Sequence, residues 1–449
     1  MLNFFSDQRR LAAARGLIEK IGEVFGSRFS VRLWDGTVIP PGAGGDSPFE
    51  VVITGPGVLG SLLRRPTGDN LLERYATGQI EIRGGSIVEF GDLLGGLKHS
   101  KTRQKVGKAV LLRHLWRALP LAFARAPKAE IGREFGGDAS GEDPGKRSNP
   151  ELIGFHYDLD NANKFFPLFL DPELLYSCAY YRSWDETLEQ AQMNKLEMIC
   201  RKLRLEPGKT LLEVGCGWGA LLCYAAQHHG VRAHGITLSR AQEEFVGRRI
   251  RERGLEDRVT VELRDYVDAE GSYDRVVSVA MLEHVGVDNL QGYFDKLHGL
   301  LDDRGVLMVH GIANRAKRGG RSGRLSSEMR LAQKYLLPGL ELADIGSMIA
   351  MMQIAGLEIH DVEGLREHYA LTSRQWCERL YERRKEAIAL VGSERYILDS
   401  LCFAGMAWSF QSGSNSLYQI VATRRRKGAS PVPPTRADLY AGSLAQPRP

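Results

Sequence analysis

The middle of the chain alternates short apolar runs with longer segments of helical periodicity. The runs that predict strands are 211–214, 232–236, 259–263, 273–279 and 305–310. Apolar residues follow a helical spacing in 186–203, 220–226, 240–253 and 290–301. Strands that alternate with helices through short connections are typical of a parallel sheet covered on both faces. The pattern therefore predicts a doubly wound α/β domain.

The stretch Thr210–Ala220, TLLEVGCGWGA, is the centre of this pattern. Its first strand leads into glycines at alternate positions, Gly215, Gly217 and Gly219, and then into a helix. Glycine lets a ligand approach the backbone closely, because no side chain stands in the way. Glu213, at the tip of the strand, can accept hydrogen bonds from ammonium or hydroxyl groups of a ligand. A tight turn that binds no ligand could contain the same glycines. The residues that follow must therefore distinguish a ligand site from a structural turn.

Polar residues follow five successive predicted strands. They are Glu213, Thr237, Asp265, Glu283 and His310. Ligands of doubly wound sheets bind outside the carboxyl ends of the strands. Because these ends meet at one edge, the recurrence predicts a site there more strongly than any one residue does. Taken singly, Glu283 could cap a turn and His310 could be structural.

The rest of the chain predicts further parts. Residues 1–97 contain a helical segment, 9–25, and strand-like segments at 29–33, 49–54 and 79–83, but no catalytic spacing. We therefore expect a small mixed α/β domain that binds or docks. The predicted divisions are an N-terminal lipid-binding domain with a basic helix, 1–125, a Gly- and Ser-rich linker, 126–150, a second domain, 151–426, and a disordered tail, 427–449.

Charge and composition narrow the function classes. From Lys98 to Arg125 the chain carries eight Lys and Arg residues and no Asp or Glu, interleaved with apolar residues near helical spacing. A cationic amphipathic helix suits an anionic membrane surface, and a solvated basic face packed on its own domain is the alternative. No zinc-finger or RNA-binding motif supports nucleic acid as the partner. Six scattered cysteines argue against disulfides or a metal site, and no signal peptide or membrane span is evident. We expect a cytoplasmic protein without a metal.

Six separated motifs make the chain resemble the cyclopropane-fatty-acyl-phospholipid synthases, which are class I S-adenosylmethionine-dependent methyltransferases with a Rossmann-like domain. These motifs are YSCAYY (176–181), LLEVGCGWG (211–219), GITLSRAQ (235–242), MLEHVG (281–286), VHGI (309–312) and HYALT (368–372). They occur in the order of the family between about residues 150 and 425. The N-terminal domain and its basic helix resemble, less specifically, the lipid-docking part of longer bacterial members.

The resemblance implies two ligand sets. The residues expected to bind S-adenosylmethionine are Tyr176, Ser177, Gly215, Gly217, Thr237 and Gln242, with Asp265 and Tyr266 at the adenine end and Glu213 at the strand tip. In this family a bicarbonate ion acts as the general base. Its expected ligands are Cys178, Glu283, His310, Ile312 and Tyr369. Direct proton removal by Glu283 or His310 stays open as a variant.

The implied reaction transfers a methylene unit to the cis double bond of a phospholipid acyl chain. Attack of an alkene on the sulfonium methyl leaves a carbocation, so the site must exclude water and must contain a base. No base is paired with Cys178 in the sequence, so we expect it to shape the site rather than act as a nucleophile. The chain departs from the family at Gly311, where Thr or Ser follows the histidine, and at Met406, where a late cysteine is common.

Three other functions stay open. The cation could lose a different proton, which would give a methylene branch and then a methyl branch. A non-catalytic lipid-binding protein could keep the same fold. A nucleic-acid methyltransferase is less favoured, because MLEHVG replaces the Asn/Asp-Pro-Pro-aromatic signature. For the main reading, the expected partners are phospholipid acyl chains and the anionic inner face of a membrane, with no nucleic acid, and a homodimer is one possible assembly.

Overall fold

The computed structural model describes residues 6–99, 116–128, 131–132, 135, 149–159, 161–316 and 327–441. The chain forms two compact units. Unit 1 comprises residues 1–134, 325–335 and 377–405, and unit 2 comprises 135–324, 336–376 and 406–449. Unit 1 therefore contains two segments from the C-terminal third in addition to the predicted N-terminal domain.

Unit 2 is built on a seven-stranded sheet with the order β10-β11-β9-β8-β5-β6-β7. Strands β7, β6, β5, β8 and β9 are parallel, and β11 is antiparallel to both of its neighbours. The strand bounds are β5 (Thr210–Val214), β6 (Arg232–Thr237), β7 (Val259–Leu263), β8 (Tyr273–Val279), β9 (Leu301–Asn314), β10 (Leu357–Gly364) and β11 (Asn415–Arg424). The chain runs from β5 to one side and later returns to β8 on the other side, which makes the β5–β8 pair the topological switch point.

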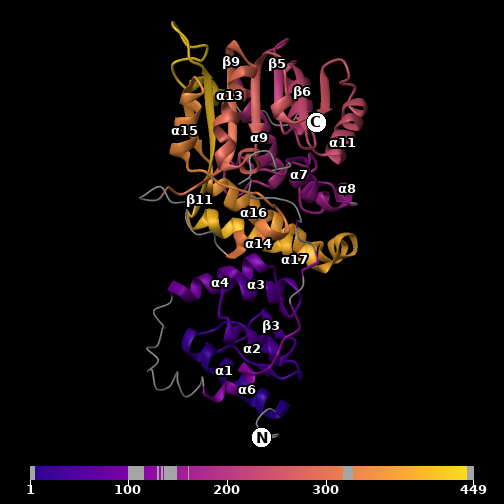
Figure 1. The fold of residues 1–449 in the computed structure, drawn as a ribbon, viewed down its shortest axis with the longest axis vertical. Helices are drawn as coiled ribbons and strands as arrows, with labels where there is room; N and C mark the ends of the chain where they lie inside the picture. Colours follow the sequence, from indigo (N-terminus) through magenta and orange to yellow (C-terminus); the bar gives the residue numbers. More distant parts are fainter. Residues whose placement is uncertain are drawn as a thin grey trace. The chain divides into compact units, whose positions relative to one another are not determined.

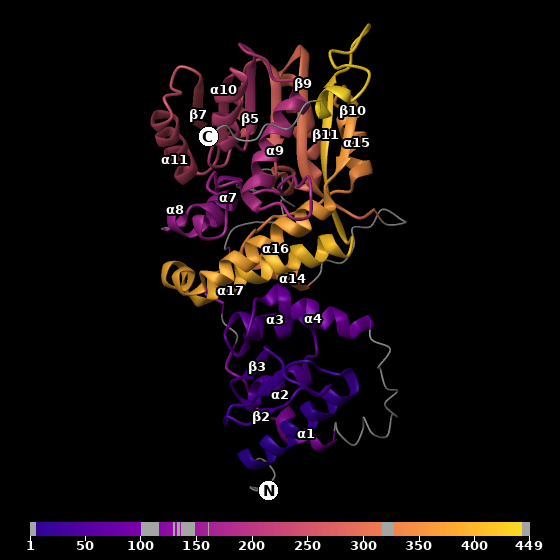
Figure 2. The same cartoon turned by 180° about the vertical axis from the view of Figure 1, so that it is seen from behind.

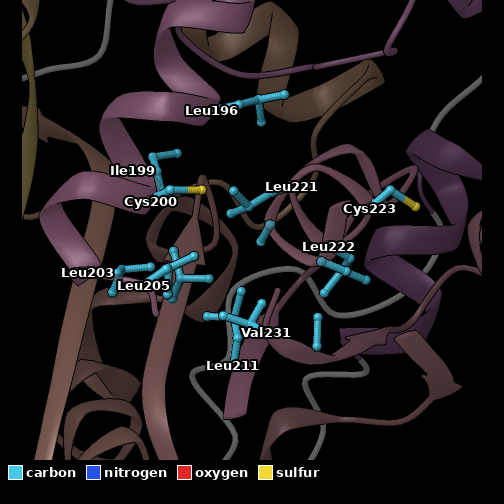
Figure 3. Close-up of a cluster of buried hydrophobic side chains, with 14 of the residues drawn as sticks. Leu196, Ile199, Cys200, Leu203, Leu205, Leu211, Leu221, Leu222, Cys223 and Val231 are labelled. Carbon is cyan, nitrogen blue, oxygen red and sulfur yellow. The ribbon is translucent and has the colours of Figure 1, made fainter. Parts of the chain in front are cut away.

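Helices cover both faces of this sheet, as the sequence pattern predicts (Figures 1 and 2). On one face, α9 (Leu188–Leu203), α10 (Ala220–His229) and α11 (Arg240–Glu252) share a core with Leu211 of β5 (Figure 3). On the other face, α13 (Leu290–Leu300) and α15 (Ile345–Ile354) pack with Leu212 and Val214 of β5. Alternate residues of β5 thus enter different cores, because successive side chains of a strand point to opposite faces.

Short helices and the C-terminal helices complete the description of unit 2. They are α7 (Asn149–Tyr157), α8 (Ala162–Phe165), η1 (Phe166–Leu168), η2 (Tyr266–Asp268), α12 (Leu282–Val285), η3 (Val287–Asn289) and α18 (Ala437–Tyr440). Helices α16 (Arg366–Glu382) and α17 (Arg384–Gln411) contribute to both units, and α17 is broken at Gly392, where φ is 80°.

Strand β9 is longer than the sequence predicts. The apolar run 305–310 ends at His310, but the strand continues to Asn314 because β11 pairs with it from Val306 to Asn314. His310 therefore lies inside a strand and not at its end. Its position still matches the end of β8, since Val279 pairs with His310.

Unit 1 contains a four-stranded mixed sheet with the order β2-β1-β3-β4. Its elements are α1 (Asp7–Phe25), β1 (Ser30–Arg32), β2 (Val38–Ile39), β3 (Glu50–Ile53), α2 (Pro56–Arg64), α3 (Gly68–Ala76), β4 (Ile80–Arg83), α4 (Ile87–His99), α6 (Leu119–Ala122) and α14 (Ser327–Tyr335). Leu33, Ile53 and Leu121 are among the residues of its core. This is the small mixed α/β fold expected of the N-terminal region. None of the helices in the described ranges is long and apolar enough to cross a membrane.

Two predicted segments fall largely outside the described residues. They are the basic segment, of which 100–115 are not described, and most of the linker 126–150. The tail predicted from Lys427 is described as far as residue 441, where Leu439 is buried and Asp438 forms an ion pair with Arg204 at 3.1 Å. Its Pro- and Ser-rich composition did not reveal this packing, because one buried leucine is enough to anchor a short segment.

Candidate active site

An open cavity of about 940 Å³ lies at the carboxyl edge of the sheet in unit 2. It is lined by the ends of β5, β6 and β8 and by the segment before α9. Of the predicted cofactor residues, those that line it are Tyr176, Ser177, Glu213, Gly215, Gly217, Thr237, Gln242 and Tyr266. Asp265 is not among the lining residues. Its carboxylate accepts a hydrogen bond from the Val267 amide at 3.1 Å and caps the short η2 helix.

The glycine turn fixes the floor of the cavity. The amides of Gly215 and Cys216 both donate to the Ile236 carbonyl at 3.0 Å, which ties the turn to β6. Gly215 and Gly217 have φ values of 78° and 53°, the left-handed region that glycine adopts readily. A Cβ on Gly217 would meet nothing within 4 Å, whereas one on Gly215 would lie 2.3 Å from the Met281 sulfur. The turn is therefore packed on one side and open to the cavity at Gly217.

Strained backbone also borders the cavity. Among the described residues, the non-glycine residues with positive φ are Leu174, Arg204 and Ala280. Leu174 and Ala280 line the cavity, and the Ala280 amide donates to the His310 carbonyl at 2.8 Å. Strain of this kind costs about 1–3 kcal/mol and persists where the surrounding structure enforces it, often at functional sites.

Glu213 and Lys195 are buried ionisable residues of the cavity wall. Glu213 is 4% exposed, and its Oε2 atom has no hydrogen-bond partner among the described residues. Burial raises the pKa of Glu213 to about 8, against the attraction of Lys195. Burial likewise lowers the pKa of Lys195 to about 8. The Lys195 ammonium donates to Ser177 Oγ at 2.8 Å, so the predicted residue Ser177 is held by a cation that the motifs did not point to.

Two predicted residues bond to each other at the end of β6. Thr237 Oγ1 donates to Gln242 Oε1 at 2.8 Å, and both residues are buried. The Ser239 amide donates to the same threonine oxygen at 3.2 Å, and the Ser239 side chain caps α11. The motif GITLSRAQ thus forms a helix start that points polar groups at the cavity wall.

Aromatic rings gather around Tyr176. Ring centroids of Phe166, Phe169 and Trp376 lie 5.4, 5.9 and 5.1 Å from its own. Trp218 of the glycine turn packs on Phe166 at 4.8 Å. Such walls exclude water and present ring faces that attract cations.

A chain of contacts links four of the five predicted base-binding residues, although none of the five is among the residues that line the cavity. Glu283 Oε1 accepts a hydrogen bond from the Ile312 amide at 2.8 Å. Ile312 pairs with Leu417 of β11, whose carbonyl accepts from the Leu365 amide at 2.8 Å. The Leu365 carbonyl in turn accepts from the Tyr369 amide at 3.2 Å and lies 3.9 Å from Cys178 Sγ. His310 is two residues before Ile312 on β9. Segments nearly 200 residues apart in sequence thus meet beside the cavity.

The side chains of this network are buried. Glu283 is 3% exposed, and its Oε2 atom is without a hydrogen-bond partner in the described part of the chain. Burial raises the pKa of Glu283 to about 7. His310 is fully buried, and burial together with Lys195 and Lys202 holds its pKa well below the ordinary value. Burial also raises the pKa of the Cys178 thiol, which keeps it protonated and unsuited to nucleophilic attack.

Comparison with known proteins identifies the family. The sequence profile of the family described as mycolic acid cyclopropane synthetase matches residues 145–420. The chain belongs to this family. It is 42% identical over 298 residues to a probable fatty acid methyltransferase of Pseudomonas putida, covering 66% of this chain and 75% of that protein. It is 33% identical over 380 residues to a probable fatty acid methyltransferase of Mycobacterium tuberculosis, covering 83% of each.

A solved structure agrees. A mycolic acid cyclopropane synthase complexed with SAH (S-adenosylhomocysteine) and CTAB is 31% identical to this chain and superposes on it with a TM-score of 0.58, over 62% of this chain and 99% of that one. The predicted fold class is confirmed: unit 2 is a class I methyltransferase domain of the cyclopropane synthase type. The roles of individual residues stay predictions.

Sequence reasoning missed some residues of this site. Lys195, Lys202 and Gln419 lie on α9 and β11, where helical and strand periodicity conceal a polar residue among apolar ones. A signal was available, because a lysine inside an otherwise buried helix face needs a partner. Among the described residues, no group of three or more His, Cys, Asp or Glu side chains is arranged to hold a metal ion.

The raised pKa of Glu283 predicts a pH-dependent cost in stability. An acid whose pKa rises from 4.5 to about 7 on folding favours the folded state fully below pH 4.5, and this advantage is lost as the pH rises to about 7. Glu283→Gln keeps an acceptor for the Ile312 amide but never ionises. We expect the variant to gain stability over the wild type between pH 5 and 7, up to about 3 kcal/mol.

Urea unfolding of the ligand-free protein at several pH values measures this difference. Glu256→Gln, at a solvent-exposed position, is the matched control and should show no such trend. A constant difference between Glu283→Gln and the wild type from pH 5 to 8 would contradict the prediction.

Proposed function

We propose that this protein transfers a methylene unit from S-adenosylmethionine to the cis double bond of unsaturated phospholipid acyl chains and forms a cyclopropane ring. One observation carries the proposal: a cavity over a glycine turn stands beside a buried carboxylate and a buried imidazole, each with an unpartnered atom. Family membership and the methyltransferase names of the relatives support it.

The cavity fits S-adenosylmethionine. The unpartnered Glu213 Oε2 is an acceptor for the amino-acid ammonium, and the open space at Gly217 accommodates atoms that a Cβ would displace. Tyr266 and the Thr237–Gln242 pair line the wall next to β6 and β7, where an adenosine would lie. S-adenosylmethionine supplies the electrophilic methyl group of the reaction.

The predicted base-binding residues fit a small anion that both donates and accepts hydrogen bonds, and bicarbonate is such an anion. Glu283 Oε2 offers an acceptor and His310 Nε2 an unpartnered ring nitrogen. Glu283 is held near His310 in sequence along β9, because its Oε1 atom accepts from the amide of Ile312, two residues after His310. Bicarbonate would supply the base, with Cys178, Ile312 and Tyr369 around it.

Other side chains of the site would exclude water, fill space and position a proton donor. The rings around Tyr176 exclude water from a cationic acyl chain and attract its charge. The protonated thiol of Cys178 fills space without competing for the methyl group. Glu283, with a pKa near 7, can hold a proton donor in place.

A second candidate is a fatty-acid methyltransferase that leaves a methylene or methyl branch. The names of the Pseudomonas and Mycobacterium relatives favour it. The same cavity and the same base serve both reactions, which differ in the proton that is removed. A non-catalytic lipid-binding protein is less favoured, because nothing in such a role requires the buried Glu213 in the cavity wall or the buried Glu283.

The product decides between these functions. We expect expression in a bacterial host without this activity to add the mass of one CH₂ to unsaturated phospholipids, in a form that resists hydrogenation. A product that takes up hydrogen would support the methylene branch, and unchanged lipids would contradict both. Glu283→Gln expressed at equal level should reduce the product and serves as the control.

Cofactor binding tests the role of Glu213. Replacing a carboxylate that binds an ammonium removes about 1.5–3 kcal/mol, so Glu213→Gln should weaken S-adenosylhomocysteine binding about 10–100-fold in calorimetry. Methylthioadenosine lacks the amino-acid end, and its affinity should stay the same. Glu262→Gln on β7 is the control. Equal loss of affinity for both ligands would refute the assignment.

We also propose that the basic segment 98–125 docks the protein on the anionic inner face of a membrane. Eight cations without an acidic residue support this. Charge reversal to Glu at Lys101, Lys105, Lys108 and Arg103 should abolish sedimentation with anionic liposomes at low salt. Reversal at the exposed residues Arg232, Arg248, Arg251 and Arg258 controls for net charge. Unchanged binding of the first variant would contradict the docking proposal.

A further inference from the structure

A row of polar side chains from α9, β10 and β11 leads to His310. Lys202, in the last turn of α9, is fully buried. Its ammonium donates to Gln419 Oε1 at 2.7 Å and to Glu363 Oε2, and Asp361 lies 3.7 Å away. Gln419 pairs with His310 in the β9–β11 ladder. These residues are not needed to hold the sheet together, since backbone hydrogen bonds already do so.

The chemistry of the ammonium fixes the orientation of the Gln419 amide. An ammonium can only donate, so the amide atom that it meets must be the oxygen. The NH₂ group of Gln419 therefore faces His310, and its nitrogen lies 3.1 Å from His310 Nδ1. Because an amide NH₂ also only donates, Nδ1 must accept.

This contact determines where the His310 proton lies. A neutral imidazole whose Nδ1 accepts a hydrogen bond carries its hydrogen on Nε2. A doubly protonated ring would set two donors against each other, and burial beside Lys195 and Lys202 disfavours it as well. His310 Nε2 has no hydrogen-bond partner within the described ranges, so its N–H donor is left for an acceptor that the described chain does not supply.

We propose that Lys202 and Gln419 are positioning residues that hold His310 as an Nε2–H donor, so that His310 binds an acceptor and does not remove the substrate proton. The inference rests on the proposed function for its consequence, but not for the proton's position. When the C–H bond of the transferred methyl group breaks, its electrons form the last ring bond and its proton goes to the bound anion or to Glu283. Proton removal is thereby assigned to the bound anion or to Glu283, and not to His310.

The proton position can be measured without turnover. In protein labelled with ¹⁵N-histidine, two-bond ¹⁵N–¹H correlations distinguish protonated from unprotonated ring nitrogens, and His310→Gln identifies the His310 signals. We expect Nε2 protonated and Nδ1 unprotonated in the wild type at pH 7. In Gln419→Glu the carboxylate accepts from the ring, and the proton should move to Nδ1. A wild-type ring protonated on Nδ1, or on both nitrogens, would overturn the proposal.

Two further variants test the same contact without a new charge, and circular dichroism shows whether they fold. Gln419→Leu removes the contact without adding a charge, and Lys202→Met frees the amide to rotate. Each should give a mixture of the two ring forms with an unchanged circular dichroism spectrum. A ring that keeps a single Nε2–H form in both variants would show that Lys202 and Gln419 do not set it.

Activity separates a donor from a base. Removing one preorganised donor typically costs about 100–1000-fold in rate, so His310→Leu should lose that much lipid methylation. His310→Gln retains an N–H near the position of Nε2 and should stay within about tenfold of the wild type. Equal loss in both variants would identify His310 as the base. Absence of any lipid product from the wild type would refute the proposed function, while the ring-nitrogen signals would still decide the proton's position.

Discussion

The site depends on the burial of ionisable side chains that lack a close partner of opposite charge. Lys195, Glu213 and Glu283 are each less than 5% exposed, and no ion pair within 4.0 Å joins any of them to another described residue. Burying an unpaired charge is costly, so each group is pushed toward its neutral form. This explains why the pKa values of Lys195 and Glu213 converge near 8. A ligand that carries its own ammonium and carboxylate would relieve this cost.

The topology of the sheet is what makes such burial tolerable. The cavity lies at the topological switch point between β5 and β8, where ligands of such sheets bind. The long strand β9 passes beside this point and is held on its other edge by β11. A rigid pair of strands can hold His310 and the Ile312 amide in place against the electrostatic cost. The Leu365 backbone is joined to Leu417 of β11, and its carbonyl lies 3.9 Å from Cys178 Sγ.

The two halves of the site differ in how they use polarity. Around the glycine turn, unpartnered acceptors and open space suit a charged ligand of defined shape. Around Glu283 and His310, hydrogen bonds from β9 and β11 leave one nitrogen and one oxygen available. Aromatic rings fill the space near Tyr176. The arrangement combines fixed dipoles with a wall of aromatic rings.

Sequence alone determined the local elements and the edge at which they meet. Strands β7 and β8 have the predicted bounds, and β6 extends one residue further, because β-branched and apolar residues in short runs favour strands. The glycine turn and the family motifs also marked most of the residues that line the cavity. Asp265 is the exception, because a residue at a strand end can turn its side chain into a local cap.

Only the tertiary structure decided the rest. Residues 377–405 belong to unit 1, which no local pattern could indicate. The extension of β9 past His310 required a partner strand more than 100 residues later. Lys195, Lys202 and Gln419 became visible once distant segments packed together, since a side chain's protonation and hydrogen bonds depend on its neighbours in space. The glycine turn in the sequence marked the cavity, whereas the hydrogen bond between Gln419 and His310 Nδ1 depends on the tertiary packing of β9 and β11.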